Sequence, residues 1–328
     1  MKISIIMPAY NSAATLEKSL KAVFSSSLQP LEVIVVDDAS IDKSTKIAKQ
    51  FPVKLITLDK NYGSGYARNA AVKHSLGEIL LFIDADVEIK NDTLATLQES
   101  FKNNSQLDAV IGLFSIEHPN KDFFSQYKNL YMHFSFSHMH DYVDFLFTSI
   151  CAVRKEVYLN FSQTRLKADD TEAGQRYKIA ERRILLDKRL EVIHLKSYNF
   201  ISFIKNDFLV PYDWARIFLK YRGLGHLARY GCFAHARLNQ ITSIIICSAS
   251  LLLLATLTLW PQKITLLYIL LGIFLALNAS FFRFLLKEKG ALFMLKSVIL
   301  TYLDMLVMGI GILAGSLAYI FIHGKKIQ

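Results

Sequence analysis

The sequence predicts an α/β fold with a doubly wound, mostly parallel sheet, followed by C-terminal transmembrane helices. Two observations predict the sheet: short β-branched apolar runs recur along residues 1–200, and segments with helical spacing separate them. A third observation predicts the membrane part, because residues 241–322 are overwhelmingly apolar and carry only a handful of charges. We therefore expect a soluble part followed by a membrane part.

Strands and helices alternate through the soluble part. Residues 3–7 and 32–36 are apolar runs typical of strands buried on both faces, and residues 12–27 between them have helical spacing, which predicts a βαβ unit. The alternation continues with strands at 53–58, 78–83, 108–116 and 190–195 and with helices at 43–50, 65–75 and 169–183. In a parallel sheet of this kind, ligands bind beyond the carboxyl ends of the strands.

The change in composition along the chain sets the expected domain boundaries. We expect an α/β domain, a basic amphipathic juxtamembrane segment and a membrane domain, at residues 1–205, 206–240 and 241–328. The membrane domain is expected to hold an interfacial helix at about 291–303 and three spans, at about 241–260, 264–286 and 304–322. Gly309, Gly311 and Gly315 in the third span permit close helix packing.

The net charge of +10 has a local source. No Asp or Glu lies between Trp214 and Lys287, whereas five cations precede the first span, namely Arg216, Lys220, Arg222, Arg229 and Arg237. Such a collar suits anionic head groups at a membrane surface, where each cation contributes roughly 1 kcal/mol. Its position beside a span favours a membrane over nucleic acid as the partner.

The N-terminus and the cysteines predict a cytoplasmic soluble part. The apolar run in MKISIIMPAY is short, is broken by Pro8 and is not followed by a small-residue cleavage site, so we expect no signal peptide. Cys151, Cys232 and Cys247 have no metal-binding spacing and suit buried free thiols in a reducing compartment. We expect an integral protein of a bacterial-type inner or plasma membrane, with the α/β domain in the cytoplasm.

Polar and acidic residues follow the expected strands at the points where the strands end. They are residues 8–11 after the first strand, 37–40 after the second, 59–61 after the third and 84–86 after the fourth. Because the carboxyl ends of parallel strands meet at one edge of a sheet, these residues are expected to converge. Neither a GxGxxG nor a Walker A sequence occurs there, which argues against a dinucleotide or P-loop site.

Asp84 and Asp86 are expected to point to the same side, because side chains alternate along a strand. Two carboxylates on one side form a hard-oxygen site that suits Mn²⁺ or Mg²⁺. An isolated DxD pair also suits a capping or loop role. The neighbouring Asp37 and Asp38 favour a ligand site, because burying these carboxylates without a metal or a hydrogen-bonding partner would crowd like charges.

Four motifs, in this order, resemble those of the inverting family 2 glycosyltransferases of the GT-A fold. The motifs are PAYN at 8–11, VVDDAS at 35–40 with Asp42, ARN at 67–69 and DAD at 84–86, and the resemblance covers roughly residues 1–200. It implies a nucleotide-sugar donor, a UDP-sugar being favoured over a GDP-sugar. The implied donor-binding residues are Pro8, Ala9, Tyr10, Asn11, Asp37, Asp38, Arg68 and Asp84. It also implies Mn²⁺ or Mg²⁺ on Asp86 and Asp84, and Asp38 is favoured for the base of the nucleotide.

A second family motif, an ED pair followed by a helix, matches LKADDTEAGQRYK at 166–178, with Asp169-Asp170 in place of Glu-Asp. The match implies that Asp170 is the catalytic base that takes a proton from the acceptor hydroxyl, with Asp169 as the alternative. These acids also suit the N-terminus of a helix, where they complement its dipole. His194, after the last strand, is either a further metal ligand or a packed histidine.

The resemblance and the spans together predict an inverting transferase that moves a single sugar to a membrane-associated, lipid-linked acceptor in cell-envelope or surface-glycan assembly. Single transfer is expected because the QxxRW motif of processive members is missing. One alternative is a polyprenyl-phosphate glycosyltransferase, whose ionised acceptor needs no base. Another is a non-catalytic membrane sensor of nucleotide sugars. A transporter is disfavoured because the spans hold few polar residues.

Overall fold

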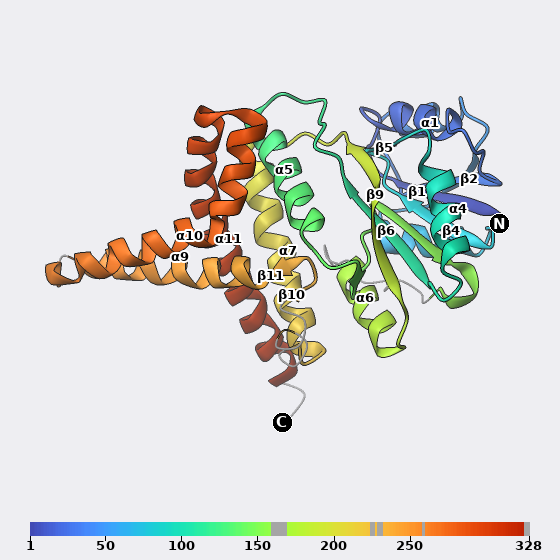
Figure 1. The fold of residues 1–328 in the computed structure, drawn as a ribbon. Helices are drawn as coiled ribbons and strands as arrows, with labels where there is room; N and C mark the ends of the chain where they lie inside the picture. The colour runs from blue at the N-terminus through green and yellow to red at the C-terminus, as the bar shows by residue number, and fades with distance from the viewer. Residues whose placement is uncertain (159–168, 224–226, 228–231, 258–259, 325–328) are drawn as a thin grey trace. The chain divides into compact units, whose positions relative to one another are not determined.

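The computed structural model describes residues 1–158, 169–223, 227, 232–257 and 260–324. The chain divides into two compact units, Met1–Ser197 and Tyr198–Gln328. Within the described residues, the first unit contains a nine-stranded mixed sheet with helices, and the second unit consists mainly of helices (Figure 1).

The large sheet has the strand order β3-β2-β1-β4-β8-β6-β9-β5, and β7 pairs with β9. Its strands are β1 (Ile3–Ala9), β2 (Glu32–Asp37), β3 (Lys54–Thr57), β4 (Ile79–Ile83), β5 (Val87–Ile89), β6 (Ala109–Phe114), β7 (Tyr142–Val143), β8 (Ile150–Arg154) and β9 (Ile184–His194). In the described part of this sheet, four strand pairs, β1 with β2, β1 with β4, β2 with β3 and β6 with β9, are parallel, and the other four are antiparallel, so the predicted α/β fold is confirmed with a mixed sheet. Strand β8 lies antiparallel between β4 and β6, which the sequence did not predict.

The helices of this unit are α1 (Leu16–Phe24), α2 (Ser44–Ala48), α3 (Ser64–Val72), α4 (Thr93–Asn103), α5 (Phe123–Ser137), the short 3₁₀ helix η1 (Lys155–Val157) and α6 (Asp169–Ile179). Helix α1 buries Leu16, Leu20 and Val23, the spacing that predicted it. Every residue of β1 and β4 is buried, as expected for strands covered on both faces.

Strand β4 ends at Ile83, and Asp84 to Asp86 form a turn. The Val87 N–H donates to the Asp84 carbonyl oxygen at 3.2 Å, and β5 then pairs antiparallel with β9. The predicted alignment of the Asp84 and Asp86 side chains depended on strand geometry, and that geometry ends before Asp84.

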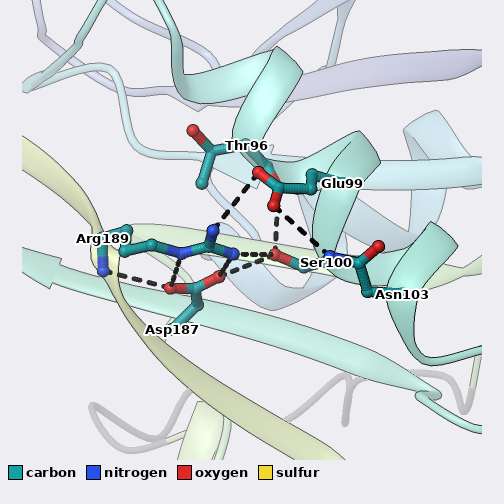
Figure 2. A network of polar contacts seen from close by, with 6 residues as sticks. All are labelled: Thr96, Glu99, Ser100, Asn103, Asp187 and Arg189. Atoms are coloured by element: carbon teal, nitrogen blue, oxygen red, sulfur yellow. Dashed lines mark hydrogen bonds and ion pairs between the residues drawn. The ribbon is translucent and has the colours of Figure 1, made fainter.

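A network of hydrogen bonds and ion pairs connects α4 with β9 (Figure 2). Asp187 is 7% exposed and accepts hydrogen bonds from Ser100 Oγ at 2.6 Å and from Arg189 Nη2 at 2.8 Å. Arg189 also reaches Glu99 at 3.2 Å. Burial by itself raises the pKa of Asp187, but the hydrogen bonds from Arg189 and Ser100 outweigh it and hold this pKa below its usual value.

The second unit contains α7 (Phe200–Lys220), β10 (Cys232–Phe233), β11 (Ala236–Arg237), α9 (Leu238–Thr256), the 3₁₀ helix η2 (Pro261–Lys263), α10 (Ile264–Lys289) and α11 (Ala291–Gly324). In the described part of the chain, three helical segments are long and apolar enough to cross a membrane, namely Leu238–Thr256, Pro261–Lys289 and Ala291–Ile322. Helix α11 runs without a break through the segments expected as an interfacial helix at 291–303 and a span at 304–322.

Helices α7 and α11 meet backbone to backbone. A Cβ atom on Gly311 would lie 2.4 Å from the Phe208 carbonyl oxygen, and one on Gly315 would lie 2.1 Å from the Tyr212 carbonyl oxygen. A Cβ atom on Gly309 would contact α9 side chains at 3.0 Å. The close packing predicted from these glycines is thus confirmed.

Candidate active site

The predicted site residues gather where β1, β2 and β4 end. Ala9 pairs with Asp37 in the register of β1 and β2, and the Asp38 N–H donates to the Ala9 carbonyl oxygen at 2.8 Å. Ile83, the last residue of β4, pairs with Ile150, the first residue of β8. This antiparallel pairing brings the loop before β8 to the same edge as Asp84.

Two side chains hold the Asp84 carboxylate in place. Arg68 Nη2, from α3, donates to Oδ1 at 2.7 Å, and Ser149 Oγ, from the loop before β8, donates to Oδ2 at 2.8 Å. Arg68 is 2% exposed, so this ion pair is shielded from water on the arginine side. Of the predicted site residues, the structure therefore joins Arg68 and Asp84 directly, and it adds Ser149, which the sequence did not suggest.

Asp86 faces His194, the last residue of β9. The Asp86 Oδ2 and His194 Nε2 atoms lie 3.8 Å apart, and the Leu195 N–H donates to the Asp86 carbonyl oxygen at 2.7 Å. The His194 ring stacks on Phe114 with centroids 4.2 Å apart. The two candidate ligands thus lie side by side at the ends of different strands.

Burial shifts both of these groups toward their neutral forms. It raises the pKa of Asp86 to about 6, with the nearby Asp84 charge adding to the effect. Burial also lowers the pKa of His194 well below its usual value, with the Lys196 charge acting in the same direction. A neutral imidazole keeps a lone pair that can bind a metal.

Asp86 and His194 lie close enough to be candidate ligands of one divalent cation. Two ligand atoms at about 2.1 Å from an octahedral ion lie about 3 Å apart when adjacent and about 4.2 Å apart when opposite. The observed 3.8 Å falls between these values. Across the described residues, no group of three or more His, Cys, Asp or Glu side chains could hold an ion. Mg²⁺ usually keeps waters and substrate phosphates in its remaining positions.

Asp37 and Asp38 are buried, each 2% exposed, and the protein itself satisfies both. Asp38 accepts the backbone N–H groups of Tyr62 and Gly63, both at 2.8 Å. Asp37 accepts the Thr45 hydroxyl at 3.0 Å. Hydrogen bonds from the protein therefore compensate the burial of this pair, so burial by itself does not require a bound ligand here.

The PAYN motif has two buried residues, Pro8 and Ala9, followed by two exposed ones, Tyr10 and Asn11. Pro8 and Ala9 are buried in β1, whereas Tyr10 is 48% exposed. Asn11 has a φ of 49°, in the left-handed region that Asn tolerates, and its Oδ1 accepts the Ile41 N–H at 2.9 Å. Tyr10 therefore offers an exposed aromatic ring at this edge of the sheet.

Helix α6 is tied to the loop that carries Ser149. Gln175 Nε2 donates to Asp144 Oδ2 at 3.1 Å. A Cβ atom on Gly174 would lie 2.3 Å from the Phe145 Cα, so only glycine allows this approach. The loop from Asp144 to Ser149 therefore links α6 to Asp84.

Asp170, in the first turn of α6, lies near the same edge. The pKa of Cys151 is raised first by burial; the Arg68 charge opposes this shift and the Asp170 charge adds to it. Both charges therefore act on one buried thiol beside the end of β4. The side chain of Asp169 lies outside the described residues.

Ser149 and Phe114 are the site contacts that sequence reasoning missed. Ser149 reaches Asp84 only because β8 pairs with β4, and the two residues are 65 positions apart. Phe114 supports His194 across 80 positions, since β6 and β9 are neighbours. The one local indication was the polar pair Thr148-Ser149 directly before an apolar strand.

Comparison with known proteins supports the fold and the family. Residues 4–160 match the model of the glycosyl transferase family 2. The chain is 32% identical over 114 residues to the poly-beta-1,6-N-acetyl-D-glucosamine synthase of Staphylococcus epidermidis, covering 34% of this chain and 28% of that protein. It is 34% identical over 118 residues to the dolichol-phosphate mannosyltransferase of Pyrococcus furiosus, covering 34% and 33%. The matched region thus spans a third or less of these relatives.

A solved structure extends the likeness to the fold of the chain. The mannosyltransferase PcManGT from Pyrobaculum calidifontis, in complex with GDP-Man and Mn²⁺, superposes with a TM-score of 0.58 at 16% identity, covering 98% of this chain and 87% of that one. At this identity the likeness concerns the fold alone. Residues 4–160 therefore form a glycosyl transferase family 2 region, within a GT-A-type sheet that three apolar helices follow in the chain.

Proposed function

We propose that the protein is a membrane-anchored, metal-dependent, inverting glycosyltransferase that moves a single sugar from a nucleotide-diphosphate sugar to a lipid-linked acceptor in cell-envelope or surface-glycan assembly. The observation that carries this proposal is the Asp86–His194 pair, 3.8 Å apart at the ligand edge of a family 2 domain. The relatives named as sugar polymer synthase and as dolichol-phosphate mannosyltransferase support the reaction class. The three apolar helices support the membrane anchor.

The donor is a nucleotide sugar, and we favour a UDP-sugar over a GDP-sugar. Tyr10 is the exposed aromatic residue of PAYN, so we assign the face of the base to it. Asp38 remains our candidate for an edge of the base, although both of its oxygens already accept backbone N–H groups. Pro8, Ala9, Asn11 and Asp37 would then shape the walls of the site.

Asp86 and His194 would hold Mn²⁺ or Mg²⁺. When bound, this cofactor supplies positive charge that neutralises the leaving diphosphate. Asp84, fixed by Arg68 and Ser149, is placed to accept hydrogen bonds from the ribose or from metal-bound water. The stacked Phe114 ring holds the His194 imidazole in orientation.

Inversion requires the acceptor oxygen to attack the anomeric carbon opposite the leaving diphosphate. For a hydroxyl acceptor, Asp170 would take the proton as general base, with Asp169 as the alternative. A polyprenyl phosphate acceptor is already ionised and needs no base. We place the catalytic domain on the cytoplasmic side, where nucleotide sugars and the anionic head groups favoured by the basic collar meet.

The Asp170→Asn variant tests which acceptor is used. A hydroxyl acceptor predicts a loss of transfer of about 10² to 10⁴-fold, whereas a phosphate acceptor predicts near-normal turnover. Asp141→Asn is the matched control, because Asp141 is 68% exposed and forms its ion pair with Lys188. Near-normal turnover of the Asp170 variant contradicts the hydroxyl version.

A non-catalytic sensor of nucleotide sugars is the second candidate. A sensor tolerates loss of the metal and base carboxylates, but Asp84, Asp86 and Asp170 are all present, and Asp84 has two dedicated partners. The presence of all three carboxylates favours an enzyme over a sensor. Tight donor binding without transfer to any lipid would favour the sensor.

A further inference from the structure

An apolar groove lies between α7 and α11 in the second unit. It has a volume of about 530 Å³, within the range of ligand-binding clefts. Its walls include Ile201, Ile204 and Phe208 on α7 and Leu303, Val307 and Ile310 on α11. These positions recur every three or four residues, so each helix contributes one continuous apolar stripe.

The contacts between α7 and α11 determine where the groove lies. Their backbones touch where Gly311 meets Phe208 and where Gly315 meets Tyr212. The groove residues lie at and before these contact points in both helices, and Phe208 belongs both to the contact and to the wall of the groove. A groove bounded by one stripe from each helix suits one hydrocarbon chain better than two.

One lining residue carries charge. Lys205 is exposed on α7, and in the described part of the chain no carboxylate forms an ion pair with it. The rest of the lining is hydrocarbon. An apolar groove with a single cation complements an amphiphile that has one apolar chain and an anionic head group.

We propose that this groove binds the hydrocarbon chain of a polyprenyl monophosphate, the acceptor lipid, and that Lys205 contacts its phosphate. The inference rests on the proposed transfer to a lipid acceptor. The phosphate monoester carries about −1.5 to −2 charges at pH 7, which the Lys205 ammonium attracts. In the chain, only residues 195–199 separate His194 from Phe200, the first residue of α7.

Equilibrium binding tests the groove on the full chain in lipid nanodiscs, without nucleotide sugar. The probes are labelled polyprenyl monophosphate, the matching polyprenol and phosphatidic acid. Ile204→Trp fills the groove and is expected to weaken binding of both polyprenyl probes at least about tenfold. Lys205→Ala is expected to weaken the monophosphate about fivefold and to leave the polyprenol unchanged.

Two controls separate the groove from general effects of tryptophan or of lost charge. Ile269→Trp on α10, where Ile269 is 53% exposed, and Lys287→Ala near the end of that helix are expected to bind like the wild type. Val307→Trp fills the groove from α11 and replaces Ile204→Trp if that variant does not fold. Unchanged binding in the folded groove variants, or equal competition by phosphatidic acid, overturns the proposal.

Together with a transfer assay, the binding assay tests the groove and the proposed glycosyltransferase function separately. If the wild type transfers sugar to lipid while Ile204→Trp and Lys205→Ala keep the wild-type acceptor KM, the groove assignment is wrong and the proposed function stands. If the wild type binds the monophosphate through Ile204 and Lys205 but transfers no sugar, the groove stands and the proposed function is wrong.

Discussion

Two carboxylates of the first unit, Asp86 and Asp187, lie in different surroundings: the Asp86 side chain is 28% exposed and the Asp187 side chain is 7% exposed. Asp187 has Arg189 and Ser100 as donors, and its pKa lies below the usual value (Figure 2). Asp86 has a like charge nearby and a neutral imidazole 3.8 Å away, and its pKa is raised to about 6, first by burial and then by Asp84. The surroundings of Asp187 stabilise its anionic form, whereas those of Asp86 favour the neutral form.

The difference separates structural carboxylates from site carboxylates. Where a folded protein supplies donors to a buried acid, the acid stabilises the fold, as at the junction of α4 and β9. Where the protein leaves a buried acid without such donors, a ligand or metal is the partner that compensates the burial. Each prediction that follows tests one side of this contrast.

The largest expected effect is on transfer by Asp86→Asn. Removal of the carboxylate is expected to reduce the rate on the order of 10³-fold, because several kcal/mol of stabilisation of the leaving diphosphate are lost. The free energy of unfolding, measured by denaturant titration, is expected to stay unchanged or to rise, because the like-charge contact with Asp84 disappears. A large fall in stability would contradict the assignment of Asp86 to the site.

Asp187→Asn is expected to show the reverse pattern. The variant leaves Arg189 and Ser100 with a weaker acceptor at a buried position, which should cost about 1 to 3 kcal/mol of unfolding free energy. Transfer per folded molecule should remain normal. A tenfold loss of specific activity at unchanged stability would contradict the structural role.

Ser149→Ala tests the support of Asp84 and is expected to have a smaller effect. Loss of one hydrogen bond of about 1 kcal/mol to a charged group should reduce transfer by roughly five- to tenfold. Ser149→Thr, which keeps the hydroxyl, should restore part of the activity. Steady-state kinetics with varied donor and metal would show whether the loss is in KM or kcat, and a wild-type rate would contradict the assigned contact.

The two acids predict opposite pH effects on the stability of the metal-free protein. Asp86 has a folded pKa of about 6, above its unfolded value, so its folded state binds more protons between about pH 4 and 6 and stability rises as pH falls through that window. The lowered pKa of Asp187 means that its contribution is present above the unfolded pKa and is lost as pH falls through the folded pKa. The test is thermal unfolding measured from pH 7 to 3. The rise in stability due to Asp86 should be absent in Asp86→Asn, and the loss of stability due to Asp187 should be absent in Asp187→Asn.

The smallest effect is expected at an exposed ion pair. Glu17 and Lys21 on α1 lie 2.6 Å apart with exposed fractions of 50% and 66%. Glu17→Gln should cost less than about 0.5 kcal/mol of unfolding free energy. A cost as large as that of Asp187→Asn would show that burial does not set the difference between the two ion pairs.

The parallel half of the sheet could be predicted from the sequence, because local periodicity and β-branched runs determine β1 to β4 and the helices between them. The antiparallel insertion of β8 could not, because the pairing of Ile83 with Ile150 depends on tertiary packing and leaves no local pattern. The turn at Asp84 to Asp86 was missed because apolar residues resume at Val87, which hides the end of β4.

In the candidate site too, local motifs predicted some residues, whereas others depend on tertiary packing. Asp84, Asp86 and Arg68 could be named from motifs, and the structure brings Arg68 and Asp84 together. His194 could be named as a candidate from the sequence. Its contact with Asp86 could not be predicted, because Asp86 is 108 positions earlier in the chain. Ser149 and Phe114 required the strand order, because each contacts its partner only through neighbouring strands of the sheet.

The most direct test of the central claim is sugar transfer in membranes that contain the full chain. The membranes are incubated with a panel of labelled nucleotide sugars and Mn²⁺ or Mg²⁺, and label is counted in the lipid extract. The account predicts lipid-bound label from at least one donor with the wild type, and its loss both with Asp86→Asn and after the metal is chelated. Donor binding without lipid-bound label from any donor would contradict it.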